Sequence, residues 1–456
     1  MTTSKPSVFL GVDMQRAGFR WMTLDEGGVE AASGARGLSD EDLRDPDRLW
    51  RSFLAILKDL APVTLKGIGV CGPDVGGFLL DETGKAVRPG TLAGDTEAAI
   101  YADYLETTAR RSRAICGSIA AADMLGPVLL HARETNPDAF ARCAMALSHK
   151  DYLVWRLTGK RVSEPTAASG TLLFAPPEPH TWAAHILNPL GIVADVLPDL
   201  QASGSIVGPL LPSLIADLDI GAPEVSTGAT SKAAGAFGLG LTHAGEMHLD
   251  LFDEASLLSL SEDFLPNPMR SIDARAWLFP ERYAQIQSLG TPLAFDAWAQ
   301  SLTVIGASDE PLYFLPGLEH GGAMAGMTPS TSARAVGEAI LLGFAFEINE
   351  AATALRDIAS LSGRILMSAP CDLASRWGQM LASALGYGID LVETEPCSAA
   401  RTTALLARSA IGGSSLAGGL ERPSPIDSFE PDDRLAAEFE ERHSGLAGLK
   451  SRLTHS

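Results

Sequence analysis

The sequence predicts an α/β protein of two domains, and three features of the chain support this. Its 456 residues exceed what one hydrophobic core usually supports. Short apolar strands alternate with segments of helical periodicity. The strand, turn and strand at the start of the chain recur near its middle, which indicates two similar halves around one cleft. We expect the first domain to cover residues 1–240 and the second to cover residues 241–456.

The first domain opens with a predicted hairpin. An apolar strand over residues 7–13 ends in Asp13, and a strand over residues 19–24 returns toward a Gly-Gly turn. The pattern then predicts a buried strand over 65–71, a strand entering a hairpin turn over 77–81, a helix over 95–111 capped by Asp95 and Thr96, and a helix over 150–159 that ends in glycine.

The second half repeats this alternation. A strand over 224–227 and a helix of small residues over 233–240 come at the boundary. The expected elements that follow are strands over 247–251 and 256–260, a helix over 333–359, a strand over 364–368, a helix over 373–385, a strand over 389–392 and a helix over 398–410. A polar linker over 413–427 precedes a final amphipathic helix over 432–453.

Composition excludes several classes of partner. The 35 basic and 56 acidic residues give a net charge of −21, which repels nucleic acid backbones and anionic membranes. No apolar run reaches the ~18 residues of a membrane span. The five cysteines form no C-x-x-C pair, which suits buried thiols in a reducing compartment. We expect a cytoplasmic protein that binds neither nucleic acid nor membrane.

A series of short motifs resembles the FGGY family of carbohydrate kinases, nearest to its xylulokinase branch. Their order and spacing follow the family from Val8 to about Leu446. The motifs are residues 84–89 with 95–96, 139–142 with 150–153, 157–159, 168–172, 203–204 with 207–208, 233–240 and 377–382. The resemblance implies two ribonuclease H-like (actin-like ATPase) domains, a sugar-side domain 1–240 and a nucleotide-side domain 241–456, with Mg-ATP and sugar in the interdomain cleft.

The resemblance assigns the metal-binding carboxylate of the family to Asp13. Oxygen ligands suit a hard cation, although an isolated aspartate at this position also suits a turn cap. The phosphate-binding turn that follows carries Gly and Thr in the family and reads Gln15-Arg16-Ala17 here. Bulkier residues obstruct the approach of backbone N–H groups to phosphate. Arg16 either binds phosphate through its guanidinium or is a solvated surface arginine, and we favour the second.

The second phosphate loop of the family aligns with a turn that contains Asp253 and Glu254. Two carboxylates would then face the triphosphate, and a like-charge contact at ~4 Å costs about 4 kcal/mol at an effective dielectric near 20. An extra metal ion held by Asp253 and Glu254 would relieve this repulsion. We favour an exposed acidic turn.

The catalytic base of the family, an aspartate, falls on Ser231. A serine hydroxyl does not accept the proton of a sugar hydroxyl at neutral pH, and the loss of a general base typically costs ~10²- to 10⁴-fold in rate. The following Lys232 offers charge stabilisation, or it is a solvated lysine at a helix start, which is the simpler account.

The ligand-binding loops of the family are also changed. On the sugar side, only Asp95 and Thr96 survive as polar contacts of the family, and Asp74 in a changed loop is a further candidate, so most of the usual sugar hydrogen bonds would be lost. On the adenine side, the glycine-rich motif becomes a segment with Ala369 and Pro370, and proline removes an N–H donor.

Together these changes predict a sugar-kinase-like protein with weak or no kinase activity and a ligand-binding or regulatory role. One alternative is an active, divergent sugar or polyol kinase that uses Mg-ATP, with Asp74 or Asp95 as base. Another is a structural partner of a genuine kinase. A homodimer and a small-molecule sugar or polyol ligand fit these hypotheses, and an inactive form needs no cofactor.

Overall fold

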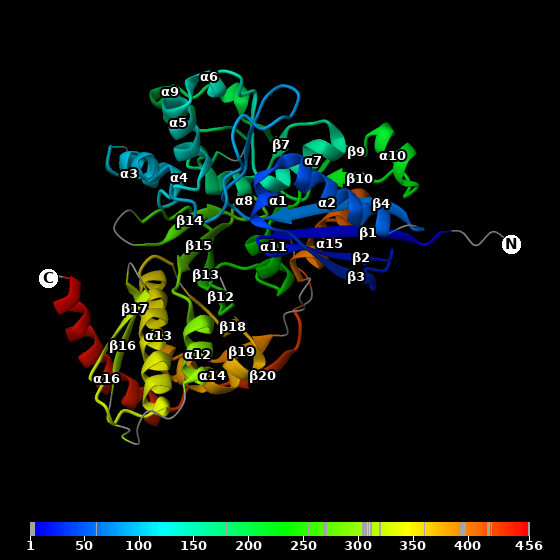
Figure 1. Ribbon diagram of the computed structural model, residues 1–456. Helices are drawn as coiled ribbons and strands as arrows, with labels where there is room; N and C mark the ends of the chain where they lie inside the picture. The colour runs from blue at the N-terminus through cyan, green and yellow to red at the C-terminus, as the bar shows by residue number, and fades with distance from the viewer. Residues whose placement is uncertain are drawn as a thin grey trace.

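Two β-sheets, one in each half of the chain, form the framework of the molecule (Figure 1). The computed structural model describes residues 5–60, 62–108, 110–178, 180–252, 255–267, 271–302, 308, 310, 312–318, 321–359, 361–392, 398–416, 420 and 422–454. Helices cover both sheets, as expected for an α/β protein. Within these ranges, none of the helices combines the length and apolar character that a membrane crossing requires.

The first sheet has the strand order β3-β2-β1-β4-β10-β9, with β11 paired beside β4. Its strands are β1 (Ser7–Gln15), β2 (Gly18–Leu24), β3 (Glu30–Gly37), β4 (Thr64–Gly72), β9 (Ile206–Pro209), β10 (Glu224–Ser226) and β11 (Ala229–Thr230). Strand β1 runs antiparallel to β2 and parallel to β4, so it is central and almost completely buried. This explains why residues 7–13 read as an apolar run.

The register of this sheet decides which residues meet at its edge. Asp13 on β1 lies opposite Cys71 on β4, and Ala229 on β11 also lies opposite Cys71. Because β1 and β11 are both parallel to β4, their carboxyl ends reach the same edge. The residue after β11, Ser231, therefore starts its helix beside Asp13.

The remaining elements of the first half surround this sheet. The helices are α1 (Asp40–Arg44), α2 (Pro46–Asp59), α3 (Ala99–Thr108), α4 (Arg110–Cys116), α5 (Leu125–Thr135), α6 (Pro137–Phe140), α7 (His149–Thr158), α8 (Pro165–Ala168), η1 (Ser169–Thr171), α9 (Ala184–Leu190), η2 (Ala194–Val196), α10 (Pro212–Leu218) and α11 (Ser231–Gly238). Two small sheets pair β5 (Phe78–Leu80) with β6 (Met145–Leu147) and β7 (Val162–Ser163) with β8 (Asp199–Leu200).

The second sheet has the order β14-β15-β13-β12-β18-β19-β20. Its strands are β12 (Met247–Asp250), β13 (Ser256–Ser261), β14 (Asp273–Ala276), β15 (Tyr283–Ser288), β18 (Ile365–Ser368), β19 (Ile389–Val392) and β20 (Pro425–Phe429). The other elements are β16 (Tyr313–Leu318) paired with β17 (Gly321–Ala325), α12 (Pro292–Ser301), α13 (Ala333–Arg356), α14 (Cys371–Leu385), α15 (Ser398–Gly412) and α16 (Asp433–Thr454). Both large sheets contain an antiparallel pair beside a parallel strand, β1–β2 with β4 and β12–β13 with β18, which agrees with the internal duplication.

Helix α15 crosses from the second half to pack against the first sheet (Figure 1). A Cβ at Gly11 of β1 would lie 1.8 Å from the carbonyl oxygen of Ala400, and one at Gly69 of β4 would lie 2.5 Å from that of Thr403. Glycine is therefore required where the helix meets these strands. Helix α11 packs on α15 in turn, so the two helices lie between the sheets. The boundary at residue 240 separates the strands of the two sheets, and it stays a prediction.

Three expected elements differ in the structure. The helix over 95–111 begins only at α3, so Asp95 and Thr96 lie before it in a loop and do not cap it. The predicted linker over 413–427 contains the start of β20, an edge strand with only one buried residue, Phe429. The long helix over 333–359 ends at Arg356.

Candidate functional site

Asp13 lies at the end of β1 and is enclosed by side chains of the protein itself. Only 1% of it is exposed. Ser231 Oγ donates a hydrogen bond of 2.5 Å to Asp13 Oδ1, and Cys71 Sγ contacts the same oxygen at 3.4 Å. Gln15 Nε2 donates to Oδ2 at 2.7 Å. The structure therefore brings together the two residues to which the resemblance assigned the metal carboxylate and the catalytic base, and both oxygens of the Asp13 carboxylate are engaged.

This environment does not fit a magnesium ligand. Burial raises the pKa of Asp13, although the hydrogen bonds from Ser231, Cys71 and Gln15 oppose the shift. A magnesium ion requires near-ideal octahedral geometry and usually retains several waters. A magnesium ion beside a nucleotide is usually held by one or two carboxylates together with phosphates and waters, and both oxygens of Asp13 already accept hydrogen bonds from the protein. Asp13 acts here as a buried hydrogen-bond acceptor.

Arg16 is bound to neighbouring protein groups. Its Nη1 donates to the carbonyl oxygen of Ala93 at 2.9 Å, and its Nη2 pairs with Asp40 at 2.8 Å. The side chain remains about half exposed. Arg16 thus ties the first hairpin to the loop before Asp95.

Asp95 forms a two-pronged ion pair with Arg44. Its two oxygens each accept from the guanidinium at 2.7 Å, and Oδ2 also accepts from the Leu92 N–H at 2.9 Å. The hydrogen bonds from Arg44 lower the pKa of Asp95. Thr96 is exposed beside it. The carboxylate organises the loop and is not free to accept a proton from a ligand.

Asp74 contacts the opposite half of the molecule. Its carboxylate pairs with Arg275 on β14, and Arg275 also pairs with Asp273 at 2.7 Å. Burial raises the pKa of Asp74, but the charges of Arg275 and Lys232 outweigh that effect and leave it lowered. The loop after β4 is therefore tied across the cleft.

Further backbone hydrogen bonds support this junction. The Ala274 N–H donates to the Gly117 carbonyl at 2.8 Å, and the Ala276 N–H donates to Ser169 Oγ at 3.0 Å. The Ile119 N–H donates to Asp273 at 2.9 Å. Strand β14, at the edge of the second sheet, is thus docked on the first half.

Ala369 and Pro370, the residues at the predicted adenine side, have no side-chain group that forms hydrogen bonds. Ala369 is buried in the core of the second half, between β18 and α14. Pro370 is the N-cap of α14, and its side chain makes no capping hydrogen bond. Asp253 and Glu254 lie outside the described residues.

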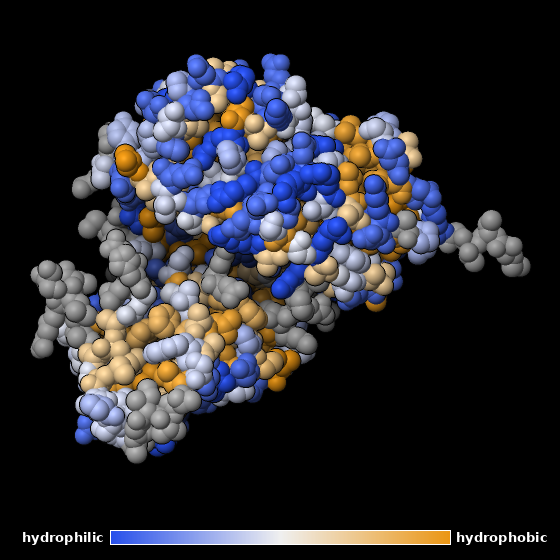
Figure 2. Space-filling view, viewed as in Figure 1, coloured by the Kyte–Doolittle hydropathy of each residue, from blue (hydrophilic) through white to orange (hydrophobic). Residues whose placement is uncertain are grey.

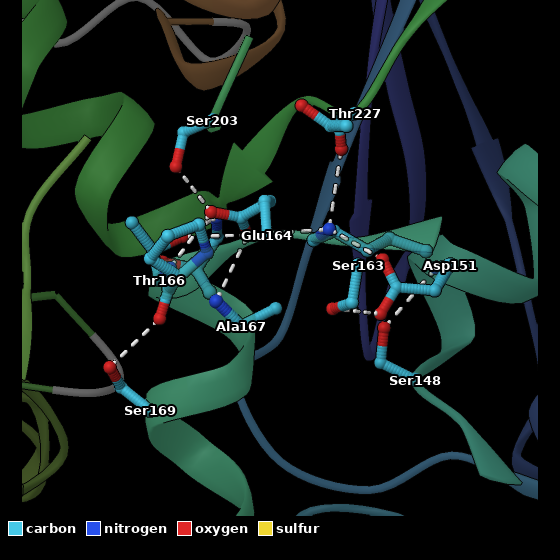
Figure 3. A network of polar contacts seen from close by, with 12 residues as sticks. Ser148, Asp151, Ser163, Glu164, Thr166, Ala167, Ser169, Ser203 and Thr227 are labelled. Carbon is cyan, nitrogen blue, oxygen red and sulfur yellow. Dashed lines mark hydrogen bonds and ion pairs between the residues drawn. The ribbon is translucent and has the colours of Figure 1, made fainter. Parts of the chain in front are cut away.

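Sequence reasoning missed a buried polar network next to this site (Figure 3). Lys150 is completely buried, and its Nζ donates to Asp151 Oδ1 at 2.6 Å and to the Thr227 carbonyl at 3.3 Å. Glu164 Oε1 forms an ion pair with Nζ at 3.3 Å. Burial lowers the pKa of Lys150, but the charges of Asp151 and Glu164 outweigh that effect and raise it.

Glu164 connects this network to the start of α11. Its carboxylate caps α8, accepting from the N–H groups of Thr166 and Ala167 at 2.8 and 2.9 Å. Thr166 Oγ1 donates to Glu164 at 2.8 Å and accepts from the Thr230 N–H at 2.9 Å. The chain of contacts therefore positions the residue immediately before Ser231. The Lys-Asp sequence of α7 was visible, but nothing in the sequence paired it with Glu164.

Asp123 was also missed. Its Oδ2 accepts from the Gly94 N–H at 2.8 Å, and its carbonyl accepts from the Gly76 N–H at 3.0 Å, so it joins the two sugar-side loops. Its Oδ1 is buried and has no hydrogen-bond partner among the described residues. Burial raises the pKa of Asp123. A single aspartate in a loop carries no sequence signal of this kind.

The halves meet around a hollow that Figure 2 shows near the centre of the molecule. Comparisons with known proteins place this architecture. Residues 30–238 match the FGGY family of carbohydrate kinases, N-terminal domain. The chain is 25% identical to a xylulose kinase of Klebsiella pneumoniae, covering 98% of this chain and 99% of that protein.

Solved structures show the same fold. A xylulose kinase from Brucella ovis superposes with a TM-score of 0.88 at 23% identity, covering 98% of this chain and 99% of that one. A gluconate kinase from Lactobacillus acidophilus superposes with a TM-score of 0.87 at 16% identity, covering 99% of each chain. The fold is therefore the two-domain, actin-like ATPase fold with an interdomain cleft. In its family match over residues 30–238 and in its full-length likeness to a xylulose kinase, this chain is similar to the FGGY family of carbohydrate kinases.

Proposed function

We propose that this FGGY-family protein has weak or no kinase activity and that it acts as a ligand-binding or regulatory protein. One observation carries the proposal: the hydroxyl of Ser231 donates a 2.5 Å hydrogen bond to Asp13. In this arrangement a hydroxyl occupies the position of the base. The carboxylate that would serve the metal is used to hold that hydroxyl.

Phosphoryl transfer needs positioned phosphates, a metal and a base, because catalysis is mostly positioning and charge stabilisation. Gln15 binds Asp13 from the turn that would cradle phosphate, and Arg16 is bound to Asp40. Mg-ATP would supply charge stabilisation if it bound, but the chain offers it few free groups in the described part of this site. The loss of the base alone is expected to cost ~10²- to 10⁴-fold in rate.

A divergent active kinase would need another carboxylate as base. The two candidates on the sugar side, Asp74 and Asp95, are each paired with an arginine, and the pKa of each is lowered. A base with a lowered pKa has a weak tendency to take a proton near neutrality. This supports the non-catalytic proposal over the divergent kinase.

The ligand that we propose is a sugar, a polyol or a derivative of one, bound in the interdomain cleft. The full-length relatives support this ligand class, since they include proteins named for xylulose and gluconate. A homodimer or a complex with a kinase partner would give the protein its regulatory role.

The test combines calorimetry with a coupled assay of ADP release. The protein is titrated with Mg-ATP alone and with a panel of pentuloses and polyols, beside a motif-intact xylulose kinase as a positive control. We expect no sugar-dependent turnover above ~1 s⁻¹, the low edge of ordinary enzyme rates. Turnover above that rate would refute the proposal.

A variant separates loss of the base from loss of the whole site. The substitution Ser231→Asp restores a carboxylate at the base position but places it against buried Asp13. We expect no recovery of turnover, because the two carboxylates repel each other and the phosphate turn is unchanged. A ligand-binding role also requires that a member of the panel raises the melting temperature, and no shift with any of them would contradict that role. Recovery of a motif-intact kinase in a pull-down would support the partner form of the proposal.

A further inference from the structure

Three charged side chains join strand β14 of the second half to the first half. Arg275, at the centre, pairs with Asp74 of the first half and with Asp273, which lies two positions earlier on β14. Arg275 is only 9% exposed. The protein itself therefore balances the guanidinium charge, and one of the two balancing carboxylates comes from the other side of the junction.

Backbone and apolar contacts surround these charges. The N–H groups of Ala274 and Ala276 point away from β15, the partner of β14 in its own sheet, and donate to the Gly117 carbonyl at 2.8 Å and to Ser169 Oγ at 3.0 Å. Ala276 also lies in a buried apolar cluster with Phe174 of the first half. The outer edge of β14 is thus bound to the first half by charge, by hydrogen bonds and by packing.

The docked strand lies apart from the helices where the chain passes between the halves. The chain leaves the first half after α11 and returns in α15, which packs on the first sheet. Figure 1 shows β14 to the left of both helices, where it contacts α8 and η1. Hinge motions pivot at a few residues where bodies are connected. Contacts at a distance from the connections must therefore break before the halves can separate.

Each charge of the pair that spans the junction keeps a partner when the halves separate. Arg275 retains Asp273 on its own strand, at 2.7 Å. Burial raises the pKa of Asp74, but the charges of Arg275 and of Lys232, at the start of α11, leave it lowered. Lys232 belongs to the first half, so it stays near Asp74. Breaking a buried ion pair is most costly when one charge is left uncompensated. Neither charge is left so here, and the contact can open reversibly.

The space beside these charges is small while β14 is docked. Asp74, Lys232 and Arg275 contribute to the lining of a cavity of about 20 Å³ between the halves. A water molecule needs about 10–15 Å³. A larger molecule therefore reaches this part of the space between the halves only after the junction opens.

We propose that Arg275 and Asp74 form a latch, a reversible ion pair that holds the two halves together and controls access to the space between them. In the closed latch, β14 is docked on the first half. In the open latch, Arg275 remains with Asp273 and Asp74 remains near Lys232. The latch goes beyond the proposed function and is independent of it, because it concerns the docking of the halves and not the groups that would bind phosphate.

Hydrogen exchange at single-residue resolution tests the latch in the full-length chain. The N–H groups of Ala274 and Ala276 report the junction, whereas that of Arg275 faces β15 and reports the strand itself. Asp74→Asn removes the charge that spans the junction and leaves Arg275 paired with Asp273. We expect exchange at Ala274 and Ala276 to become at least about tenfold faster, while the N–H groups of Arg275 and of β12 stay within about twofold of the parent protein.

Two further variants complete the test. Arg275→Met combined with Asp74→Asn should exchange no faster at the junction than Arg275→Met alone, because both substitutions remove the same contact. The matched control is Arg364→Met. Arg364 also pairs with two carboxylates, Asp390 at 2.8 Å and Glu430 at 2.5 Å, but all three residues belong to the second half. The control should leave exchange at the junction within about twofold of the parent protein, and thermal melts verify that each variant is folded.

Three results would overturn the inference. The first is unchanged exchange at Ala274 and Ala276 in Asp74→Asn. The second is an equal rise at the N–H of Arg275, because β14 would then be leaving its own sheet and not the first half. The third is an equal rise throughout β12 and β18, because the ion pair would then stabilise the whole fold. Kinase turnover would refute the proposed function and would leave these comparisons unchanged.

Discussion

Replacing Lys150 by methionine should strongly destabilise the first half of the molecule. The lysine is completely buried, and its Nζ lies 2.6 Å from Asp151 and 3.3 Å from Glu164. Methionine fills a similar volume but leaves two buried carboxylates without their cation. Removing one partner of a buried ion pair typically costs about 3–5 kcal/mol.

We expect the loss in free energy of unfolding to stay within that range, because both carboxylates keep other hydrogen bonds. Glu164 retains its bonds to Thr166, Ala167 and Ser203, and Asp151 retains its bond from Ser163. For a cooperative unit the size of the first half, 1 kcal/mol shifts the melting temperature by about 2–4 °C. We therefore expect a fall of roughly 6–20 °C, which differential scanning calorimetry measures.

The direction of the pH effect follows from the same charges. Protonation neutralises the orphaned carboxylates in Lys150→Met, so the stability deficit of the variant should narrow as the pH falls. In the parent protein, the raised pKa of Lys150 means that its contribution persists through neutral pH and is lost only as the pH rises through that raised value. Hydrogen exchange should also quicken at the start of α11, because Glu164 and Thr166 hold Thr230.

Two further variants control this prediction. Lys160→Met removes a lysine whose Nζ donates to the Val207 carbonyl at 2.7 Å and should cost only about 1 kcal/mol. The double variant Lys150→Met with Glu164→Gln should lose less free energy of unfolding than the two single variants lose together. The reason is that the second substitution removes one of the carboxylates that Lys150→Met leaves without a cation. A fall below 2 °C for Lys150→Met, or simple additivity in the double variant, would refute the reasoning.

Two more predictions concern the sugar side of the cleft. Burial raises the pKa of Asp123, so the contribution of this carboxyl group to stability is full below its unfolded pKa and is lost as the pH rises through its folded pKa. The substitution Asp123→Asn should therefore reduce the fall in melting temperature between acidic and neutral pH. An unchanged pH profile of the melting temperature would contradict this. Gly117 has φ +75°, and a Cβ there would lie 2.0 Å from the Ala274 carbonyl oxygen. Gly117→Ala should therefore lower the free energy of unfolding by at least the ~1–2 kcal/mol of left-handed strain. It should also speed hydrogen exchange in β14. Gly363→Ala is its control, with φ +77° and no atom within 4 Å; equal losses in the two variants would show that the junction with β14 adds nothing.

The strands and helices were largely predictable because their apolar periodicity is local. The first strand, the duplication after residue 246 and the helix from residue 333 all appear in the structure near their expected positions. Strand β20 was missed because four of its five residues are exposed, so an edge strand reads as a linker. The helix expected from Asp95 begins later, and Asp95 pairs with Arg44 instead. That contact spans 51 residues and has no local signal.

The sequence by itself indicated the α/β class and the resemblance to the FGGY kinases, and it predicted that Ser231 stands where the family has its base. These conclusions depend on periodicity and on motif order, which are properties of neighbouring residues. Only the tertiary structure decided how the altered positions act together. Ser231 meets Asp13 across 218 residues because β1 and β11 both run parallel to β4 and end at the same edge of the sheet. The same holds for Arg275 and Asp74, which are 201 residues apart and meet where β14 docks on the first half. Long-range register and docking, which leave no local pattern in the chain, therefore determine which charges are paired.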